Sequence, residues 1–275
     1  MGTVRPAAVA GSFYPGEPGE LARVLAELLA GGRAGLTALE AAARFVEAPK
    51  AVIVPHAGYI YSGSTAALGF AALERARDRL RRVVLLGPTH RVYIDGLALP
   101  AVDAFATPLG VVPVEPVEPA VRAALPQLVD SRPAHAAEHS LEVQLPFLQT
   151  VLDSFDLVPL AVGGATPEEV ADVLDALWDG PETAVVVSSD LSHYLPYDAA
   201  VTVDSASTAQ MLALDGPLSH EQACGATPVN GLLLAARRRG LSARLLGRCN
   251  SGDTAGDRRR VVGYAAVAFD AARAA

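Results

Sequence analysis

The chain has 275 residues, of which 51% are hydrophobic and 19% charged, so it can bury a sizeable core and does not have the composition of a disordered protein. Its net charge of −8 disfavours nucleic acid and anionic membranes as main partners. No apolar stretch approaches the roughly 20 residues that span a bilayer, the start lacks a secretion-signal pattern, and two cysteines cannot form a disulfide framework, so we expect a cytoplasmic protein.

Short apolar strands and amphipathic helices alternate along the chain. In chain order, the patterns predict a helix over 19–29, a strand over 51–54, a helix capped by Ser64 or Thr65, a strand over 83–86, a helix over 118–129 and a helix capped by Ser140. They continue with a strand over 157–162, a helix over 167–178, a strand over 184–188, helices near 200–214 and 228–239, and strands over 244–246 and 261–269. Segments 31–49 and 90–115 are predicted to be weakly structured, without resembling an interdomain linker. The alternation predicts one α/β domain over residues 1–275, with a mainly parallel central sheet flanked by helices.

Three of the predicted strands lead directly into loops that carry histidine. Each strand is short and apolar throughout, as expected where a parallel sheet is covered on both faces. In open α/β sheets, ligands bind where the carboxyl ends of the strands meet. The pattern therefore predicts a polar catalytic or metal site at this edge, built from loops that contain His56, His90 and the pair Asp190 and His193.

His56 and His90 are candidate ligands of one metal ion, because neutral imidazole is the commonest metal ligand in proteins. The alternative for each is an exposed or locally hydrogen-bonded histidine. His193 is expected to act as a general acid or base tuned by Asp190, or else to belong to a capped turn. A serine-hydrolase triad is disfavoured, since the glycine-flanked nucleophile elbow is missing.

Two more polar segments are candidates for the site. Residues 138–142 place His139 between Glu138 and Glu142 around a predicted helix start, where the carboxylates either complement the helix dipole or orient a ligand or substrate. The loop 247–254 either offers a metal ligand or is an ordinary hairpin turn. The other histidines and cysteine are expected outside the site, with Cys224 buried before a turn and His135 and His220 on the surface.

Taken together, these segments resemble the MEMO family, including the bacterial and archaeal members called AmmeMemoRadiSam system protein B. The resemblance covers nearly the whole chain, and the order of its motifs is more specific than any one of them. The motifs are Arg5-Pro6-Ala7-Ala8-Val9-Ala10-Gly11-Ser12-Phe13-Tyr14-Pro15, Pro55-His56-Ala57-Gly58-Tyr59, Gly87-Pro88-Thr89-His90, Glu138-His139-Ser140-Leu141-Glu142, Ser189-Asp190-Leu191-Ser192-His193, Asn250-Ser251-Gly252-Asp253 and Val262-Gly263-Tyr264-Ala265-Ala266.

The resemblance implies a fold similar to class III extradiol dioxygenases, which cleave catecholic rings with non-haem iron. By that comparison His56 and His90 match two metal ligands, and Asp253 is the better-matching third ligand, with Cys249 as the alternative. A carboxylate from Asp253 favours Fe(II), whereas a thiolate from Cys249 favours copper or zinc. His193 matches the catalytic base and Asp190 its neighbour. The residues expected to contact substrate are Tyr59, His139 and Glu142.

Three functions follow as alternatives. The first is a metal-dependent oxidoreductase of dioxygenase type that acts on an unidentified small molecule. The second is a metal- or peptide-binding adaptor that keeps the fold without the chemistry, as animal members are regarded as signalling proteins. The third is a metal-dependent hydrolase or lyase. The resemblance further implies radical-SAM system proteins as partners, and a homodimer is the usual form of a soluble oligomer.

Overall fold

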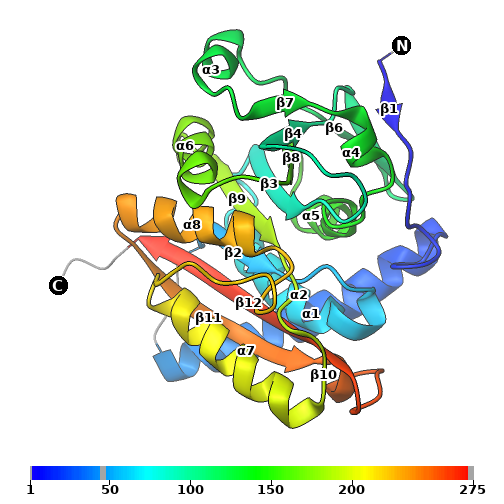
Figure 1. Cartoon of the computed structure of the whole chain (residues 1–275). Coiled ribbons are helices and arrows are strands. Elements are labelled where there is room, and N and C mark those ends of the chain that lie inside the picture. Colours follow the sequence, from blue (N-terminus) through cyan, green and yellow to red (C-terminus); the bar gives the residue numbers. More distant parts are fainter. Residues whose placement is uncertain (1, 44–47, 272–275) are drawn as a thin grey trace.

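A mixed β-sheet forms the centre of the molecule (Figure 1). The computed structural model describes residues 2–43 and 48–271. Four parallel strands lie in the middle of the sheet, in the order β2 (Ala51–Val54), β9 (Thr183–Ser188), β3 (Arg82–Pro88) and β8 (Asp156–Val162). Further strands extend it on both sides: β12 (Val261–Ala271), β11 (Leu241–Asn250) and β10 (His193–Leu195) beyond β2, and β4 (Leu97–Leu99) and β7 (Leu128–Asp130) beyond β8. A separate three-stranded sheet contains β1 (Val4–Arg5), β5 (Ala104–Thr107) and β6 (Gly110–Pro113).

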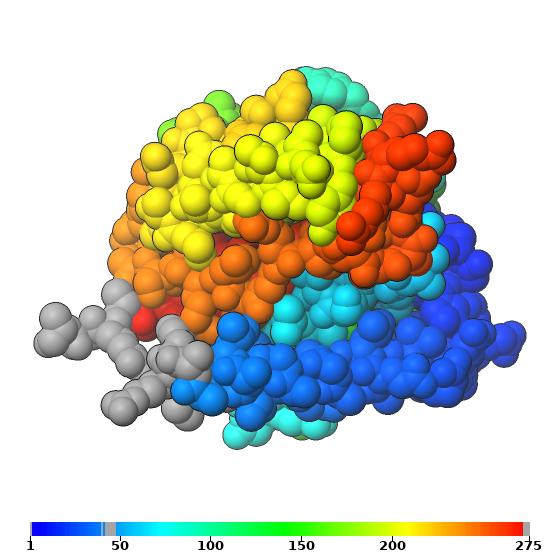
Figure 2. All heavy atoms as spheres, turned by 90° about the horizontal axis from the view of Figure 1, so that it is seen from below, coloured from blue at the N-terminus to red at the C-terminus, as the bar shows by residue number. Residues whose placement is uncertain are grey.

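Helices cover both faces of the large sheet, which is why its central strands are apolar throughout. One face carries α1 (Pro18–Ala43), α2 (Tyr59–Glu74) and α5 (Leu145–Val151), and the other carries α6 (Pro167–Leu177), α7 (Tyr197–Leu212) and α8 (Ala226–Arg238). Figure 2 shows α1 in blue along the outside of α2 in cyan. Successive strand residues alternate between the faces, so that Val52 packs toward α1 and α2 while Ile53 packs toward α6 and α8. The short helices are α3 (Pro119–Ala124), α4 (Arg132–Ala136), η1 (Glu142–Gln144) and η2 (Ser251–Asp253).

The structure confirms the predicted fold class, a helix-flanked α/β sheet with a parallel centre. The strands predicted over 51–54, 83–86, 157–162 and 184–188 are the four central ones, and the helix predicted over 167–178 is α6. These segments were predictable because each strand is a short apolar run that ends at turn residues, and the helix repeats its apolar residues with the helical period. No helix among the described residues combines the length and apolarity needed to cross a membrane.

Several predicted boundaries were wrong. The segment 31–49 is not weakly structured, because α1 continues to residue 43; residues 44–47 lie outside the described residues. Gly32 resembles a helix breaker, yet a Cβ there would lie 2.6 Å from the carbonyl oxygen of Ala67, so its glycine permits α1 and α2 to pack closely. The segment 90–115 is also structured, since it contains β4, β5 and β6.

Three local helix predictions also need correction. The helix expected to begin after Ser64 or Thr65 begins at Tyr59, directly after Gly58. The helix expected over 118–129 ends at Ala124 and is followed by β7. Ser140 does not cap a helix, because its hydroxyl donates a hydrogen bond to the carbonyl of Pro88 instead.

His135 is a buried residue of α4, not the surface residue that was expected, since it is only 2% exposed. Its Nε2 lies 2.8 Å from the carbonyl oxygen of Ala98 and its Nδ1 has no hydrogen-bond partner, which identifies Nε2 as the protonated nitrogen of a neutral ring. Burial is the main cause that lowers the pKa of His135 from 6.5 to about 4.

A stability measurement against pH tests this placement. Between pH 6.5 and 4 the unfolded chain takes up a proton at His135 and the folded protein does not, so the free energy of unfolding falls with decreasing pH over this range. The loss attributable to this residue is about 3 kcal/mol, and it is complete near pH 4. Urea unfolding of His135→Gln should therefore give a shallower pH dependence than the wild type, whereas His220→Gln, on an exposed residue, should not. Equal slopes for wild type and His135→Gln would contradict the prediction.

Candidate metal centre

The carboxyl ends of three adjacent strands bring the predicted site residues to one edge of the sheet. Val54 of β2 pairs in register with Ser188 of β9, and β9 in turn pairs with β3. His56 follows β2 by two residues and His90 follows β3 by two residues. The imidazole centroids of His56 and His90 are 5.2 Å apart, so the structure places the two predicted ligands side by side.

Hydrogen bonds fix the ring orientation of His56, which is 2% exposed. Its Nδ1 lies 2.8 Å from the hydroxyl oxygen of Ser188, and that hydroxyl donates its own proton to the carbonyl of Ser140. The Ser188 oxygen must therefore accept a proton from Nδ1, which leaves Nε2 of His56 with a free lone pair. Burial, reinforced by the charges of His90 and His139, lowers the pKa of His56 well below its ordinary value and keeps the ring neutral.

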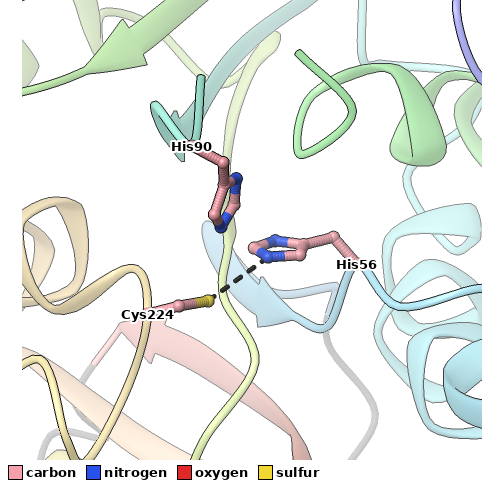
Figure 3. A group of neighbouring side chains, drawn as sticks. All are labelled: His56, His90 and Cys224. Atoms are coloured by element: carbon pink, nitrogen blue, oxygen red, sulfur yellow. Dashed lines mark hydrogen bonds between the residues drawn. The ribbon is translucent and has the colours of Figure 1, made fainter. Parts of the chain in front are cut away.

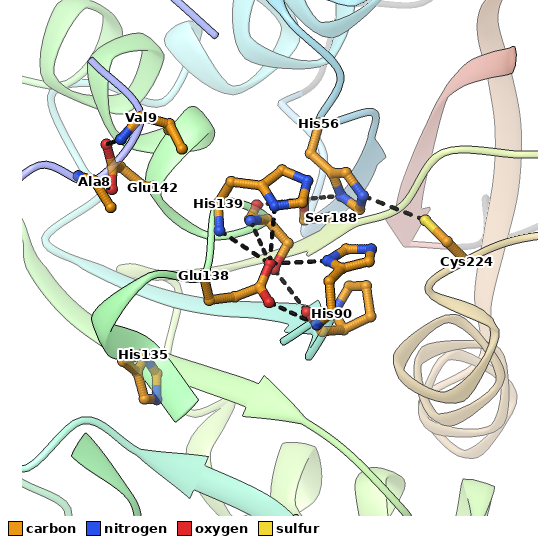
Figure 4. Close-up of polar contacts among 12 residues, drawn as sticks. Ala8, Val9, His56, His90, His135, Glu138, His139, Glu142, Ser188 and Cys224 are labelled. Carbon is orange, nitrogen blue, oxygen red and sulfur yellow. Dashed lines mark hydrogen bonds and ion pairs between the residues drawn. The ribbon is translucent and has the colours of Figure 1, made fainter. Parts of the chain in front are cut away.

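The His90 ring is oriented by the carboxylate of Glu138 (Figure 4). Nδ1 of His90 lies 2.9 Å from Oε1 of Glu138, whose two oxygens also accept bonds from the backbone N–H groups of His90, His139 and Ser140. Burial raises the pKa of Glu138, but the hydrogen bonds from His90 and Ser140 outweigh it and hold the pKa at about 2. The carboxylate is thus ionised and can only accept, so Nδ1 of His90 donates and Nε2 is the nitrogen left to bind a ligand.

Cys224, in the loop before α8, completes a group of three possible metal ligands (Figure 3). Its Sγ is 3.3 Å from Nε2 of His56, and ligand atoms of His56, His90 and Cys224 all lie within 4.8 Å of one another. Two ligands of a tetrahedral ion with Zn–N and Zn–S bonds of ordinary length are roughly 3.5 Å apart. The spacing of His56 and Cys224 thus fits a shared ion without rearrangement.

Sequence reasoning missed Cys224, which was expected to be an inert buried residue. The sequence signal that could have drawn attention to Cys224 is the glycine directly after it. In the structure a Cβ at Gly225 would lie 2.7 Å from Cβ of Ser189, so a glycine is needed there. The glycine lets this loop approach the end of β9, where Cys224 N donates to the carbonyl of Asp190 over 3.3 Å. Burial raises the pKa of the Cys224 thiol to about 12, and the nearby charge of Asp190 adds to this. A bound dication offsets both effects and deprotonates the thiol.

The structure does not bring Asp253 or Cys249 into this group. Asp253 lies in η2, where one carboxylate oxygen accepts from the backbone N–H of Asn250 and the other from the hydroxyl of Tyr197. Cys249 lies in β11, with its Sγ 3.0 Å from the hydroxyl of Thr65. Neither residue belongs to a metal-binding group among the described residues. The geometry therefore places Cys224, and neither Asp253 nor Cys249, beside His56 and His90.

His193 and Asp190 both line the cavity above the three ligands, but they do not form the tuned pair that was expected. Nδ1 of His193 lies 2.9 Å from the carbonyl oxygen of Leu191 and donates to it, so Nε2 is the free nitrogen. Burial lowers the pKa of His193 below its ordinary value. The Asp190 carboxylate accepts from the backbone N–H of His56 instead, and burial raises its pKa to about 7.

The three residues predicted to contact substrate have three different positions. His139 lines the cavity, with its ring 4.6 Å from that of His90. Tyr59 is 5% exposed, and its hydroxyl donates to the carbonyl of Val143 outside the cavity. Glu142 is fully buried and holds the N-terminal segment through Arg5 (Figure 4 shows its contacts with Ala8 and Val9). The placement of Tyr59 and Glu142 therefore does not match the prediction.

The cavity has a volume of about 650 Å³ and opens at the carboxyl edge of the sheet. Aromatic rings form much of its wall, including Phe13 from the N-terminal segment and Tyr264 from β12. Four histidines (His56, His90, His139 and His193) and Asp190 are among its polar groups. Its volume and its mixture of aromatic walls and a few polar groups are within the range of small-molecule sites in proteins.

Comparisons with known proteins agree with one another. Residues 5–268 match the family model described as "Memo-like protein". A MEMO1 family protein of Methanosarcina barkeri is 34% identical over 279 residues, which cover 96% of this chain and 99% of that protein. The corresponding proteins of Ignicoccus hospitalis (35% identical; 97% of this chain, 98% of that protein) and Aquifex aeolicus (34%; 97% and 99%) are similar to the same extent. Among solved structures, an uncharacterized protein of Escherichia coli K12 shares the fold, with a TM-score of 0.52 and 16% identity over 79% of this chain and 98% of that chain.

Proposed function

The chain belongs to the family of Memo-like proteins, and from that premise we propose that it is a metal-dependent oxidoreductase whose ion is held by His56, His90 and Cys224. One observation supports this above all others. Two imidazole nitrogens and one sulfur converge, while Ser188 and Glu138 hold the other nitrogen of each ring. Outer hydrogen bonds of this kind are what orient histidines toward metal ions in proteins.

The ligand set selects the metal class. Fe(II) was expected on the assumption that Asp253 supplies a carboxylate, but a thiolate with two imidazoles favours copper or zinc. We propose copper, because it is the redox-active ion of these two and stands above zinc in divalent affinity. Bound copper supplies one-electron redox chemistry at the floor of the cavity.

His193 is the residue proposed to move protons. Its Nδ1 donates to Leu191, its Nε2 is free, and its lowered pKa keeps the ring neutral at pH 7, so Nε2 can accept a proton from a substrate hydroxyl. The rings of Phe13 and Tyr264 line the same space. A radical-SAM partner, a homodimer and a cytoplasmic location remain predictions from the sequence.

The test is metal content together with oxygen consumption. Anaerobically purified protein should bind about one copper ion per chain, and His56→Ala should lose it. His193→Gln should keep the metal while oxidation of a panel of phenols and diols slows by about 10²–10⁴-fold. His220→Gln, on an exposed residue outside the cavity, is the control.

Two outcomes contradict the proposal in different ways. Protein that binds no ion after reconstitution with copper, zinc or Fe(II) has no metal centre of this kind. Zinc bound tightly in preference to copper, without oxygen consumption, keeps the metal centre and removes the redox chemistry.

A further inference from the structure

The cavity lining contains Arg260 and Asp257, but the two do not pair with each other, since Asp257 binds Arg259. Among the described residues that line the cavity, Arg260 is the one permanent cation. No ion pair joins it to a described residue, because the neighbouring Asp257 accepts from Arg259, with Nε 2.7 Å from the carboxylate. The protein as a whole has a net charge of −8, so an unneutralised arginine at this position is not part of a generally basic surface.

Tyr194 holds Arg260 in place. The guanidinium carbon of Arg260 lies 5.0 Å from the centroid of the Tyr194 ring, a distance typical of a cation–π contact. Tyr194 has a φ of 60°, in the left-handed region, and it is 61% exposed although it lies beside the catalytic candidate His193. A bulky residue adopts this backbone conformation only where its surroundings enforce it, and such strain concentrates at ligand-binding sites.

The pairing of β10 with β12 explains how this conformation is imposed. His193 pairs with Val262 and Leu195 pairs with Val261, so the register shifts across Tyr194. The irregularity turns the Tyr194 side chain toward the segment before β12 that carries Arg260. That segment, orange-red in Figure 2, stands out at one end of the molecule.

A second arginine lies next to a cavity-lining residue in the chain. Arg91 follows His90 in the chain, is exposed, and has no ion pair with a described residue. Phe13 also lines the cavity, with its ring centroid 4.7 Å from that of His139 and tilted by 43° to it.

We propose that Arg260, positioned by Tyr194, binds an anionic substituent, carboxylate or phosphate, of a substrate whose planar ring lies against the aromatic wall. Arg260 is then a specificity-determining residue that selects aromatic anions over neutral aromatic molecules. The inference rests on the proposed function, since it takes this cavity as the substrate site. It does not depend on which metal is bound.

Binding of benzoate, phenyl phosphate and neutral benzamide tests the proposal, measured by calorimetry on protein of known metal content. Arg260→Gln should lower the affinity for the better-bound of the two anions by roughly 10-fold or more, which is the loss expected for a hydrogen bond to a charged group. Arg237→Gln removes the same charge from an exposed position of α8 outside the cavity lining, and should leave binding unchanged. Benzamide should bind equally to wild type and Arg260→Gln. The preferred anion distinguishes a carboxylate from a phosphate site.

Tyr194 is tested by two replacements. Tyr194→Asn removes the ring but tolerates a positive φ, so it should weaken anion binding without unfolding the loop, and Tyr194→Phe should restore it.

Three results would overturn the inference. They are equal affinity for benzamide and the better-bound anion, equal losses in Arg237→Gln and Arg260→Gln, or no binding of either anion in the millimolar range. Anion binding that is lost in His56→Ala and kept in Arg260→Gln would assign the anion to the metal instead. Failure of the proposed function is separate, because it appears as absence of metal in the wild type.

Discussion

Replacing Cys224 by serine is expected to lower metal affinity by more than about 100-fold, because losing a residue that only orients a ligand already costs about 10–100-fold. Cys224 contributes the single sulfur of the ligand group, and its Sγ lies 3.3 Å from Nε2 of His56. A serine hydroxyl is not deprotonated as readily as a thiol and is a poor ligand for a soft ion. Competition with a chelator of known affinity measures the change.

Cys249→Ser is the matched control. Cys249 is the other cysteine of the chain, and its Sγ contacts Thr65 within the strand and helix packing of β11 and α2. Its replacement should leave metal affinity within about twofold of the wild type, as expected for a residue outside the coordination sphere. The metal affinity of Asp253→Asn is measured in the same way and should also stay close to that of the wild type. If Asp253→Asn or Cys249→Ser releases the metal while Cys224→Ser retains it, the assignment of the third ligand is wrong.

Glu142→Ala is expected to lower the free energy of unfolding by about 3–5 kcal/mol, the cost of breaking a buried ion pair. Glu142 is 0% exposed and lies 2.5 Å from the guanidinium of Arg5, which is 4% exposed. Its carboxylate also accepts from the backbone N–H groups of Ala8 and Val9 and from the hydroxyl of Tyr14. Removing it leaves the buried Arg5 cation and two buried donors, the N–H of Val9 and the hydroxyl of Tyr14, without their partner.

Urea unfolding measures this loss, with Glu27→Ala as the control. Glu27 pairs with Arg23 one helical turn away, but the two side chains are 66% and 61% exposed, so the control should cost less than about 1 kcal/mol. The double replacement of Arg5 by Met and Glu142 by Leu should recover part of the loss, since it removes both buried charges. A cost for Glu142→Ala as small as that of the control would show that this cluster does not anchor the N-terminal segment.

The anchor also concerns the site, because the segment that Glu142 holds continues to Phe13. Phe13 packs against His139 in the cavity wall. The carboxylate of Glu142 thus contributes to the shape of the cavity from a distance, although sequence reasoning expected it to contact substrate itself. Its neighbour Glu138, by contrast, accepts a hydrogen bond from Nδ1 of His90 and so fixes the orientation of that ring.

Sequence patterns were sufficient where the information is local. The strands before His56, His90 and Asp190 are apolar throughout and end at polar loops, so their burial and their shared edge follow from general properties of parallel sheets. The helix α1 was predicted only over its first half, because the tolerance of Gly32 depends on how closely α2 packs against it.

By itself, the sequence determined the α/β class, the family resemblance and the convergence of His56 and His90, since all three depend on patterns within segments or on their order. Only the tertiary structure decided that Cys224 joins the two histidines, from 168 residues beyond His56. It likewise decided that the carboxylates of Asp253 and Glu142 are already satisfied by other partners. The physical reason is that a side chain's function depends on which groups compete for its polar atoms, and that competition is set by the packing of segments that are distant in the chain.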